Sequence, residues 1–193
     1  MSRNADTSTP ILPVLAERWS PRSFDTSRSL TMADLTPAFE AARWSPSLSN
    51  LQEWRFLVGF RGDATFAAMT EHLSGWNASW APNAGAIVIG MYEDDPENRG
   101  REYAPYDLGQ AMAHFSVQAH ADGLFVHQAA GFDRDAIAAH FNVPTTWKVF
   151  VVAAVGHLGA PELLDETLRA RETAPRVRRP LDETVFTHPF PAA

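Results

Sequence analysis

Two clusters of arginine stand near opposite ends of a chain whose formal net charge is −7. The first lies in the stretch ERWSPRSF, where Arg18 and Arg22 flank Ser20. The second, RARETAPRVRR over residues 169–179, holds five of the 15 arginines. A guanidinium group can bind a phosphate through two parallel hydrogen bonds, which a lysine ammonium cannot do. The two clusters therefore predict a site for a small, localised anion.

Other kinds of chemistry find little support in the residue pattern. The seven histidines form no H-x-x-x-H pair, and His114 and His120 fall on opposite sides of a predicted helix, so we expect no metal site. The chain has no cysteine, which excludes disulfides, thiolate metal sites and thiol nucleophiles. It has no G-x-S-x-G elbow, no G-x-G-x-x-G fingerprint and no G-x-x-x-x-G-K-[ST] loop. A serine nucleophile, a Rossmann dinucleotide site and a P-loop are therefore disfavoured.

Length and composition limit the class of protein. With 193 residues, 45% of them hydrophobic, the chain can bury one core, and we expect a single domain over 1–193 with a flexible start at 1–9 and an extended C-terminal arm at 180–193. The acidic balance disfavours nucleic acid or an anionic membrane as a partner, because both need an extended basic surface. No apolar run approaches the roughly 20 residues of a bilayer span, and the first residues are polar, so we expect a cytoplasmic protein.

Helix and strand patterns alternate between the two arginine clusters. Apolar spacing and end signals predict helices over residues 11–20, 31–45, 107–123, 133–142 and 161–172. Asp107 is expected to cap the third of these helices, and Gly123 to end it. Short runs rich in aromatic and β-branched residues predict strands over residues 53–60, 84–92 and 147–159. Together these elements predict an α+β domain with a small sheet wrapped by helices.

Five segments occur in a fixed order along roughly residues 10–186. They are ERWSPRSF, SPSLSNLQEWRFLV, GLFVHQAAGFD, VVAAVGHLG and APRVRRPLDETV. This order resembles the FMN-dependent nitroreductase family. The resemblance implies a nitroreductase-like α+β fold with a small, central, mainly antiparallel sheet flanked by helices. It also implies an intertwined homodimer, joined through long helices and exchanged termini, with FMN at the interface and contacted by both subunits.

Carried onto this sequence, the resemblance implies which residues bind FMN. Arg18, Ser20 and Arg22 would reach the phosphate, the ribityl chain and the N1–O2 edge of the flavin ring. Arg176 and Arg178 would close on the same phosphate, which explains why two distant clusters are needed. The implied cofactor-binding set is Arg18, Trp19, Ser20, Arg22, Pro46, Ser47, Leu48, Asn50, Gln128, Ala130, Gly131, Arg176 and Arg178. No side chain is assigned a catalytic role.

Two further segments of that set have different implied positions. Residues 46–50 would contact the flavin from the partner subunit. In HQAAG, the backbone N–H of Ala130 or Gly131 would face the flavin N5 and O4 atoms. FMN is favoured over FAD, because arginines that close around a terminal phosphate leave little room for a second phosphate and an adenosine.

Some positions depart from the family pattern. Glu53 follows Gln52 where the family commonly has proline, and Ala130 stands where some members carry glutamate. Backbone hydrogen bonding tolerates both changes, so FMN binding is expected to survive. Trp76 and Trp80 lie in a segment where family members diverge most. They would either cover the flavin face or pack in the core.

Each segment alone also fits a purely structural role. An R-x-S-x-R sequence at a helix end is usually a solvated cap, PSLSN is typical of a turn, and RVRR is typical of an exposed polar stretch. His127 alone is more often a structural histidine than a catalytic acid. The joint order of the segments is what favours the flavin site.

The resemblance implies an FMN-dependent NAD(P)H oxidoreductase with a ping-pong mechanism. Electrons would pass from NADH or NADPH to a small-molecule acceptor, namely a nitro compound, a quinone or an activated alkene. Two alternatives stay open at this point: a flavin-dependent oxidase or dehalogenase on the same fold, and a non-catalytic flavin-binding or sensor protein.

Overall fold

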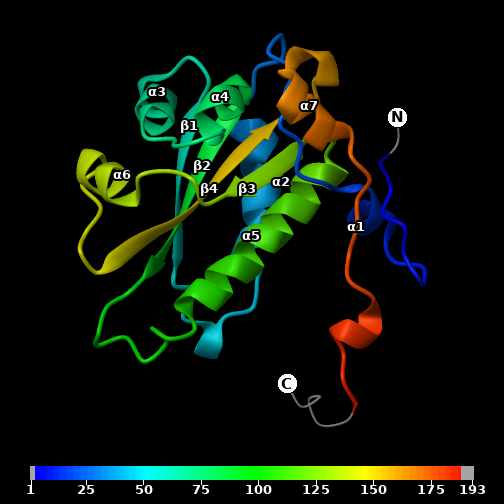
Figure 1. The fold of residues 1–193 in the computed structure, drawn as a ribbon. Helices are drawn as coiled ribbons and strands as arrows, with labels where there is room; N and C mark the ends of the chain where they lie inside the picture. The colour runs from blue at the N-terminus through cyan, green and yellow to red at the C-terminus, as the bar shows by residue number, and fades with distance from the viewer. Residues whose placement is uncertain (1–2, 188–193) are drawn as a thin grey trace.

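A four-stranded antiparallel sheet in the order β1-β2-β4-β3 forms the centre of the computed structural model, which describes residues 3–187 (Figure 1). The strands are β1 (Trp54–Phe60), β2 (Ala86–Glu93), β3 (Phe125–Ala129) and β4 (Trp147–Gly156). The helices are α1 (Pro13–Glu17), α2 (Met32–Arg43), α3 (Ala64–Glu71), α4 (Asn77–Trp80), α5 (Ala104–Ala121), α6 (Arg134–His140) and α7 (Glu166–Thr173). The predicted α+β fold with a small antiparallel sheet is confirmed.

Helices α2 and α5 cover one face of this sheet (Figure 1). Helix α2 begins where predicted, because the Asp34 carboxylate accepts hydrogen bonds from the Thr31 N–H at 2.7 Å and the Thr31 hydroxyl at 2.8 Å. Its Leu35, Ala38 and Ala42 recur at helical spacing and are all buried against α5 and the sheet. The small alanines let the two helices approach closely.

Helices α3 and α6 lie against the opposite face (Figure 1). Strand β2 runs through the middle of the sheet and sends alternate side chains to the two faces, since successive residues of a strand point in opposite directions. Ile87 and Ile89 join the core under α3 and α6, whereas Val88 packs on the α2 and α5 side. Two apolar layers therefore hold the sheet from both sides.

Helix α5 begins earlier than predicted, which corrects the assignment of Asp107 as its cap. The helix starts at Ala104 with Pro105 in its first turn, a position that tolerates proline because no intrahelical N–H bond is lost there. Asp107 is buried inside the first turn and receives hydrogen bonds from elsewhere. The end of the helix is as predicted, because Gly123 takes a positive φ of 82° just after Asp122.

Several other elements differ from the predictions. Helix α1 is shorter than the predicted helix over 11–20, and the predicted helix over 161–172 is a 3-10 turn at 161–163 followed by α7. Strand β3 and helices α3 and α4 were not predicted. Strand β3 has only five residues and α4 only four, too few for a clear periodic pattern.

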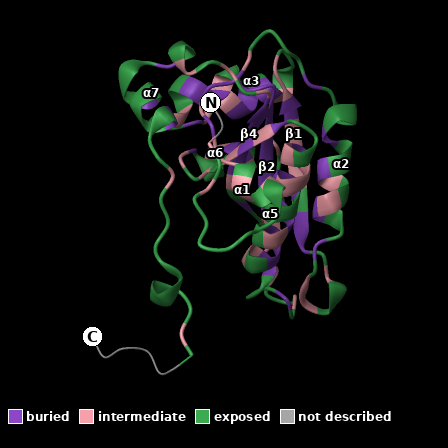
Figure 2. Ribbon diagram, turned by 90° about the vertical axis from the view of Figure 1, so that its right-hand side faces the viewer, coloured by how far each residue is buried: buried purple, intermediate pink, exposed green. Residues whose placement is uncertain are grey.

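The chain after α7 leaves the body of the protein (Figure 2). Residues 174–187 are almost all exposed and make no strand, although a 3-10 turn at Leu181–Glu183 interrupts the extended path. Val177, Leu181 and Val185 are 81%, 60% and 62% exposed. Residues 180–187 of the predicted arm lie in this segment, and the rest of the predicted range, 188–193, lies outside the described residues.

Candidate functional site

A hollow of about 280 Å³ lies between α1, α5 and β3. Three residues of the predicted set, Arg18, Ser20 and Gln128, line it, together with residues of α5. The Gln128 amide donates hydrogen bonds to the Met112 carbonyl at 3.1 Å and to the Ser116 hydroxyl at 3.0 Å. These bonds fix the Gln128 side chain against α5, so the wall of the hollow is pre-formed.

The two arginine clusters meet beside this hollow. Burial is the main cause that lowers the pKa of the half-buried Arg18, and repulsion from Arg178 lowers it further. Burial and then the charges of Arg18, Arg178 and Arg3 lower the pKa of Arg176. Guanidinium groups from the start and the end of the chain therefore lie close enough to repel one another, which is the arrangement expected of an anion site.

Arg176 and Arg178 are held differently. Arg176 donates to the carbonyl oxygens of Arg3 and Ala16, both at 2.7 Å, and so ties the start of the arm to the end of α1. Arg178 is exposed and donates to the carbonyl of its own neighbour Val177 at 2.8 Å. Arg178 therefore has more freedom to turn toward a ligand than Arg176 has.

Arg22 and Trp19 do not line the hollow. The buried Glu172 accepts both the Arg22 and the Ser23 backbone N–H, at 3.0 and 3.1 Å, and its carboxylate lies 3.9 Å from the Arg22 guanidinium. Burial lowers the pKa of Arg22 and the charge of Glu172 opposes this effect. Trp19 packs edge-on against Phe125, with centroids 6.1 Å apart. Sequence reasoning missed Glu172, because RARET resembles an ordinary exposed helix.

His127 and Trp80 form part of the core. Trp80 is 1% exposed, and its ring lies 4.4 Å from the His127 ring and 6.2 Å from that of Phe24. His127 Nδ1 lies 2.8 Å from the Pro21 carbonyl oxygen, so Nδ1 carries the proton of the neutral ring. Burial is the main reason that the pKa of His127 falls to about 4. Of the two roles left open for Trp80, the core role is the observed one.

A loop contact holds the segment that the resemblance places beside the flavin N5. The Gly131 carbonyl accepts hydrogen bonds from the Ser74 N–H and from the Asn77 side-chain amide, both at 3.1 Å. A Cβ atom at residue 131 would lie 2.7 Å from the Asn77 Nδ2 and 3.3 Å from the Ser74 carbonyl oxygen, so a larger residue would displace the Asn77 amide from its hydrogen bond. Sequence reasoning missed Asn77, since nothing local links residue 77 to residue 131.

Trp76 occupies a different environment from Trp80. It is 49% exposed, and the Arg171 guanidinium lies 3.9 Å from the centre of its ring. It also lines a hollow of about 510 Å³ between α4 and the start of α7. Trp76 is therefore a surface residue next to the loop that holds Gly131.

The predicted segment 46–50 follows Ser45, whose hydroxyl lies 2.7 Å from His114 Nδ1 of α5, and it reaches the first turn of that helix at Leu48. The Leu48 N–H donates to the Asp107 carboxylate at 2.8 Å, in the first turn of the helix, whereas Ser116 lines the hollow with Arg18. Nine residues of helix between Asp107 and Ser116 correspond to about 14 Å at about 1.5 Å per residue. Within one chain, this segment is not brought to the arginine hollow.

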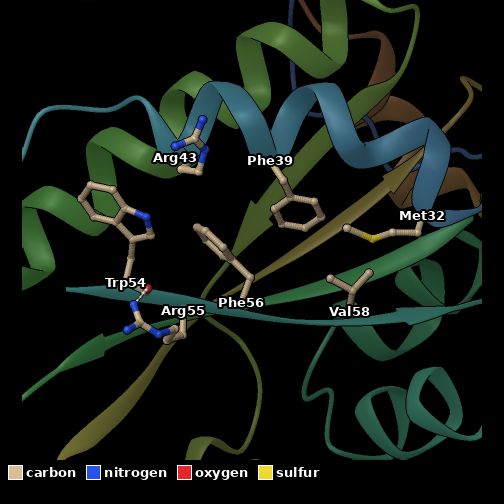
Figure 3. Close-up of a pocket in the computed structure, with 7 residues that line it drawn as sticks. All are labelled: Met32, Phe39, Arg43, Trp54, Arg55, Phe56 and Val58. Atoms are coloured by element: carbon tan, nitrogen blue, oxygen red, sulfur yellow. Dashed lines mark hydrogen bonds between the residues drawn. The ribbon is translucent and has the colours of Figure 1, made fainter. Parts of the chain in front are cut away.

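A further hollow of about 300 Å³ lies between α2 and the edge strand β1 (Figure 3). Its lining is mainly apolar, with Phe39 from α2 and Phe56 and Val58 from β1 pointing toward one another (Figure 3). It contains no residue of the predicted set. We therefore assign the cofactor hypothesis to the arginine hollow and not to this one.

Within residues 3–187, no group of three or more histidine, aspartate or glutamate side chains is arranged to hold a metal ion. In the same range, no helix combines the length and the apolar character needed to cross a bilayer.

Comparison with known proteins relates this geometry to a family. The Nitroreductase family matches residues 15–79 and 60–157. An uncharacterized 15.4 kDa protein in the ask 5′ region of Mycolicibacterium smegmatis is 36% identical over 141 residues, which cover 69% of this chain and 95% of that protein. A solved structure described as an oxidoreductase containing FMN is 30% identical, with a TM-score of 0.91 over 100% of this chain and 99% of that one.

A more distant structure shares the fold. An NAD(P)H:FMN oxidoreductase assignment has been given to a Staphylococcus epidermidis protein that is 18% identical, with a TM-score of 0.75 over 91% of this chain and 94% of that one. The family match, the relative above 30% identity and the converging arginines agree with one another. The chain belongs to the nitroreductase family.

Proposed function

We propose that this protein is an FMN-dependent oxidoreductase that passes electrons from NADH or NADPH to a small-molecule acceptor. The observation that carries the proposal is the meeting of Arg18, Arg176 and Arg178 beside a pre-formed hollow. Like charges at short range destabilise a protein unless a ligand compensates them. The related structure that contains FMN supports a flavin phosphate as that ligand.

The residues of the hollow fit FMN. The phosphate would be held by Arg18 and Arg178 and by Ser20, whose hydroxyl lies 3.4 Å from the Arg18 guanidinium. Arg176 would add charge while its guanidinium stays bonded to the α1 carbonyl. Charge-assisted hydrogen bonds from fixed donors suit a dianionic phosphate. Backbone at Ala130 and Gly131 would then lie along the reacting edge of the ring.

Bound FMN would supply the two-electron chemistry by accepting a hydride from a nicotinamide and delivering electrons to an acceptor. The chain contributes orientation and charge. Asn77 and Ser74 hold the Gly131 backbone in place, and the arginines provide positive potential around the site. Donor and acceptor would occupy the same face in turn, a ping-pong cycle that needs no separate dinucleotide fold. Nitro compounds, quinones and activated alkenes are the acceptor classes we propose.

We also propose that the active form is a homodimer. Leu48 contacts α5 about 14 Å along the helix from Ser116, and no residue of segment 46–50 lines the hollow of its own chain, so a partner chain is its simplest route to the flavin. An uncovered stripe on α5, formed by Tyr106, Gly109 and Ala113, offers a surface for close helix packing. The exposed apolar residues of the C-terminal arm add a second surface.

The absorbance spectrum of the purified protein, before and after anaerobic NADH and NADPH, tests the proposal. We expect a yellow protein with about one FMN per chain, bleached by at least one nicotinamide and recoloured by a quinone or nitro compound without oxygen. An equimolar solution of free FMN is the control for uncatalysed reduction. A colourless protein that binds no added FMN would refute the flavin site.

The two alternatives predict different results, the first in an aerobic assay of oxygen uptake and the second in the same absorbance experiment. A flavin oxidase or dehalogenase would turn over its own substrate with oxygen uptake and without nicotinamide. A non-catalytic sensor would keep its yellow colour with both NADH and NADPH. Neither alternative has an observation of its own in this structure.

A further inference from the structure

Glu53 is a buried carboxyl group that the proposed mechanism does not use. It lies between the turn at 48–50 and strand β1, and it is 2% exposed. Within the described residues, neither of its carboxyl oxygens has a hydrogen-bonding partner. Buried carboxylates are ordinarily paired with a cation or with several donors, so this residue requires an explanation.

The surroundings of Glu53 contain negative groups and close-packed backbone. Asp107 on α5 and Glu93 at the end of β2 both face it and oppose its ionisation. Gly100 packs directly on the carboxyl group, because a Cβ atom at residue 100 would overlap both Glu53 Oε1 and the Leu51 side chain. The loop after β2 therefore lies directly over the Glu53 carboxyl group at Gly100.

These surroundings favour the neutral acid over the carboxylate. Burial is the main cause that raises the pKa of Glu53, and Asp107 and Glu93 raise it further, against a smaller opposing effect of its own backbone N–H. An ionised carboxylate in this position would have to leave the pocket or bring water into it.

Glu53 also stands at the end of an unusual stretch of backbone. Ser49, Asn50 and Gln52 have φ angles of 50°, 58° and 57°, a region that residues other than glycine seldom adopt. Such a conformation persists only where neighbouring contacts impose it. At its start, the Leu48 N–H bonds to Asp107 and the Gln52 N–H bonds to the Ser47 hydroxyl at 3.0 Å. Burial of Glu53 fixes the other end.

We propose that Glu53 is a positioning residue, whose neutral side chain holds segment 46–52 in the conformation that binds FMN, so that its ionisation weakens FMN binding. The proposal rests on the proposed function for its ligand. It concerns a residue that departs from the family pattern, and it gives this chain a pH dependence that a proline at position 53 could not provide.

The direction of the pH effect follows from the coupling between protonation of Glu53 and the closed structure. A carboxylic acid whose pKa is raised in the folded structure stabilises that structure fully below its ordinary pKa. This stabilisation is lost as the pH rises toward the raised value. FMN affinity should therefore fall as the pH rises, relative to a variant that cannot ionise. Glu53→Gln keeps the size and shape of the side chain without a titrating group, and Glu71→Gln on the exposed end of α3 is the matched control.

The experiment measures FMN dissociation constants from pH 5 to pH 9 for the full-length wild type, Glu53→Gln and Glu71→Gln. Because the titration of the FMN phosphate affects all three proteins equally, the ratio of wild type to Glu53→Gln isolates Glu53. We expect this ratio to rise with pH, up to about tenfold for each unit by which the pKa of Glu53 is higher in the FMN-bound protein than in the FMN-free protein. The ratio of wild type to Glu71→Gln should stay near one.

A ratio for Glu53→Gln that does not change with pH would overturn the inference, even if FMN binds tightly. If none of the three proteins binds FMN, the proposed function fails instead, and thermal unfolding then decides the role of Glu53. In that case, the thermal unfolding midpoint of Glu53→Gln should exceed that of wild type by a margin that widens from pH 5 to pH 9. A constant margin would overturn the inference as well.

Discussion

Replacing Arg18 by alanine tests whether the two arginine clusters grip one phosphate. Arg18 is half-buried, lines the hollow and is close enough to Arg178 for the two charges to repel. In the protein without ligand, that repulsion is an unfavourable interaction. Removing either guanidinium should therefore weaken FMN binding without lowering the stability of the ligand-free protein.

The magnitude follows from the number of hydrogen bonds lost. One charge-assisted hydrogen bond contributes about 1.5–3 kcal/mol in a partly buried site. At about 1.4 kcal/mol per factor of ten, Arg18→Ala should raise the FMN dissociation constant about tenfold to a hundredfold. Arg178→Ala should have a smaller effect, because water screens its exposed side chain more strongly. Arg176→Ala should in addition lower the unfolding midpoint, since it removes two hydrogen bonds to carbonyl groups.

The assay is a fluorescence titration of FMN into each ligand-free variant, with thermal unfolding of the same samples. Arg99→Ala, at an exposed position in the loop after β2, is the control. Arg101 would be a poor control because it pairs with Asp94 at 2.6 Å. The double variant Arg18→Ala with Arg178→Ala should depart from additivity, because in the proposed site both residues would contact one phosphate. Equal FMN affinities for Arg18→Ala and Arg99→Ala would refute the shared phosphate site.

The other predictions concern packing, pH and assembly. Gly131→Ala should lower the free energy of unfolding by about 1–3 kcal/mol, because its Cβ would press on Asn77, and adding Asn77→Ala should recover part of the loss in urea unfolding. Because burial lowers the pKa of His127 to about 4, its neutral ring stabilises the fold fully above the ordinary histidine pKa. This stabilisation is lost as the pH falls from about 6.5 toward about 4. The free energy of unfolding of His127→Gln should therefore fall by about 3 kcal/mol less than that of wild type when the pH is lowered from 7 to 4. Urea unfolding at pH 7, 5.5 and 4 measures this, and the same pH dependence in both proteins would contradict the prediction. Light scattering should show a dimer at micromolar concentration that truncation after Arg179 weakens, whereas a flavin-loaded monomer of the full chain would contradict the proposed assembly.

The fold could be predicted where local signals decide the structure. Thr31 and Asp34 form a reciprocal cap whose chemistry is contained in four residues, and Gly123 ends α5 because glycine accepts a positive φ. Asp107 shows the limit of such signals. Its residue type suits a helix cap, yet its carboxylate receives the Leu48 N–H from a segment 59 residues away. A local pattern cannot distinguish a cap from a tertiary contact.

The arginines of the candidate site could be picked out from the sequence, but their arrangement could not. The types of Arg18, Arg176 and Arg178 indicated an anion, and the structure brings them together through the path of the chain after α7. Glu172, Asn77 and Glu53 had no comparable signal. The importance of each depends on one partner far away in sequence, or on the lack of any partner, and neither can be read from neighbouring residues.

Helix α5 accounts for why one chain carries two separate parts of the proposed site. Its first turn holds segment 46–50 through Asp107, and its later turns form the wall of the arginine hollow with Ser116. In a two-fold symmetric dimer that packs the two copies of α5 in antiparallel directions, the early turns of one helix lie beside the late turns of the other. Segment 46–50 of each chain is then carried toward the hollow of its partner without any change in the fold of either chain. The uncovered stripe of Tyr106, Gly109 and Ala113 runs from the first turn of the helix to the hollow, which Ala113 also lines, and such a dimer would make its closest contact along it.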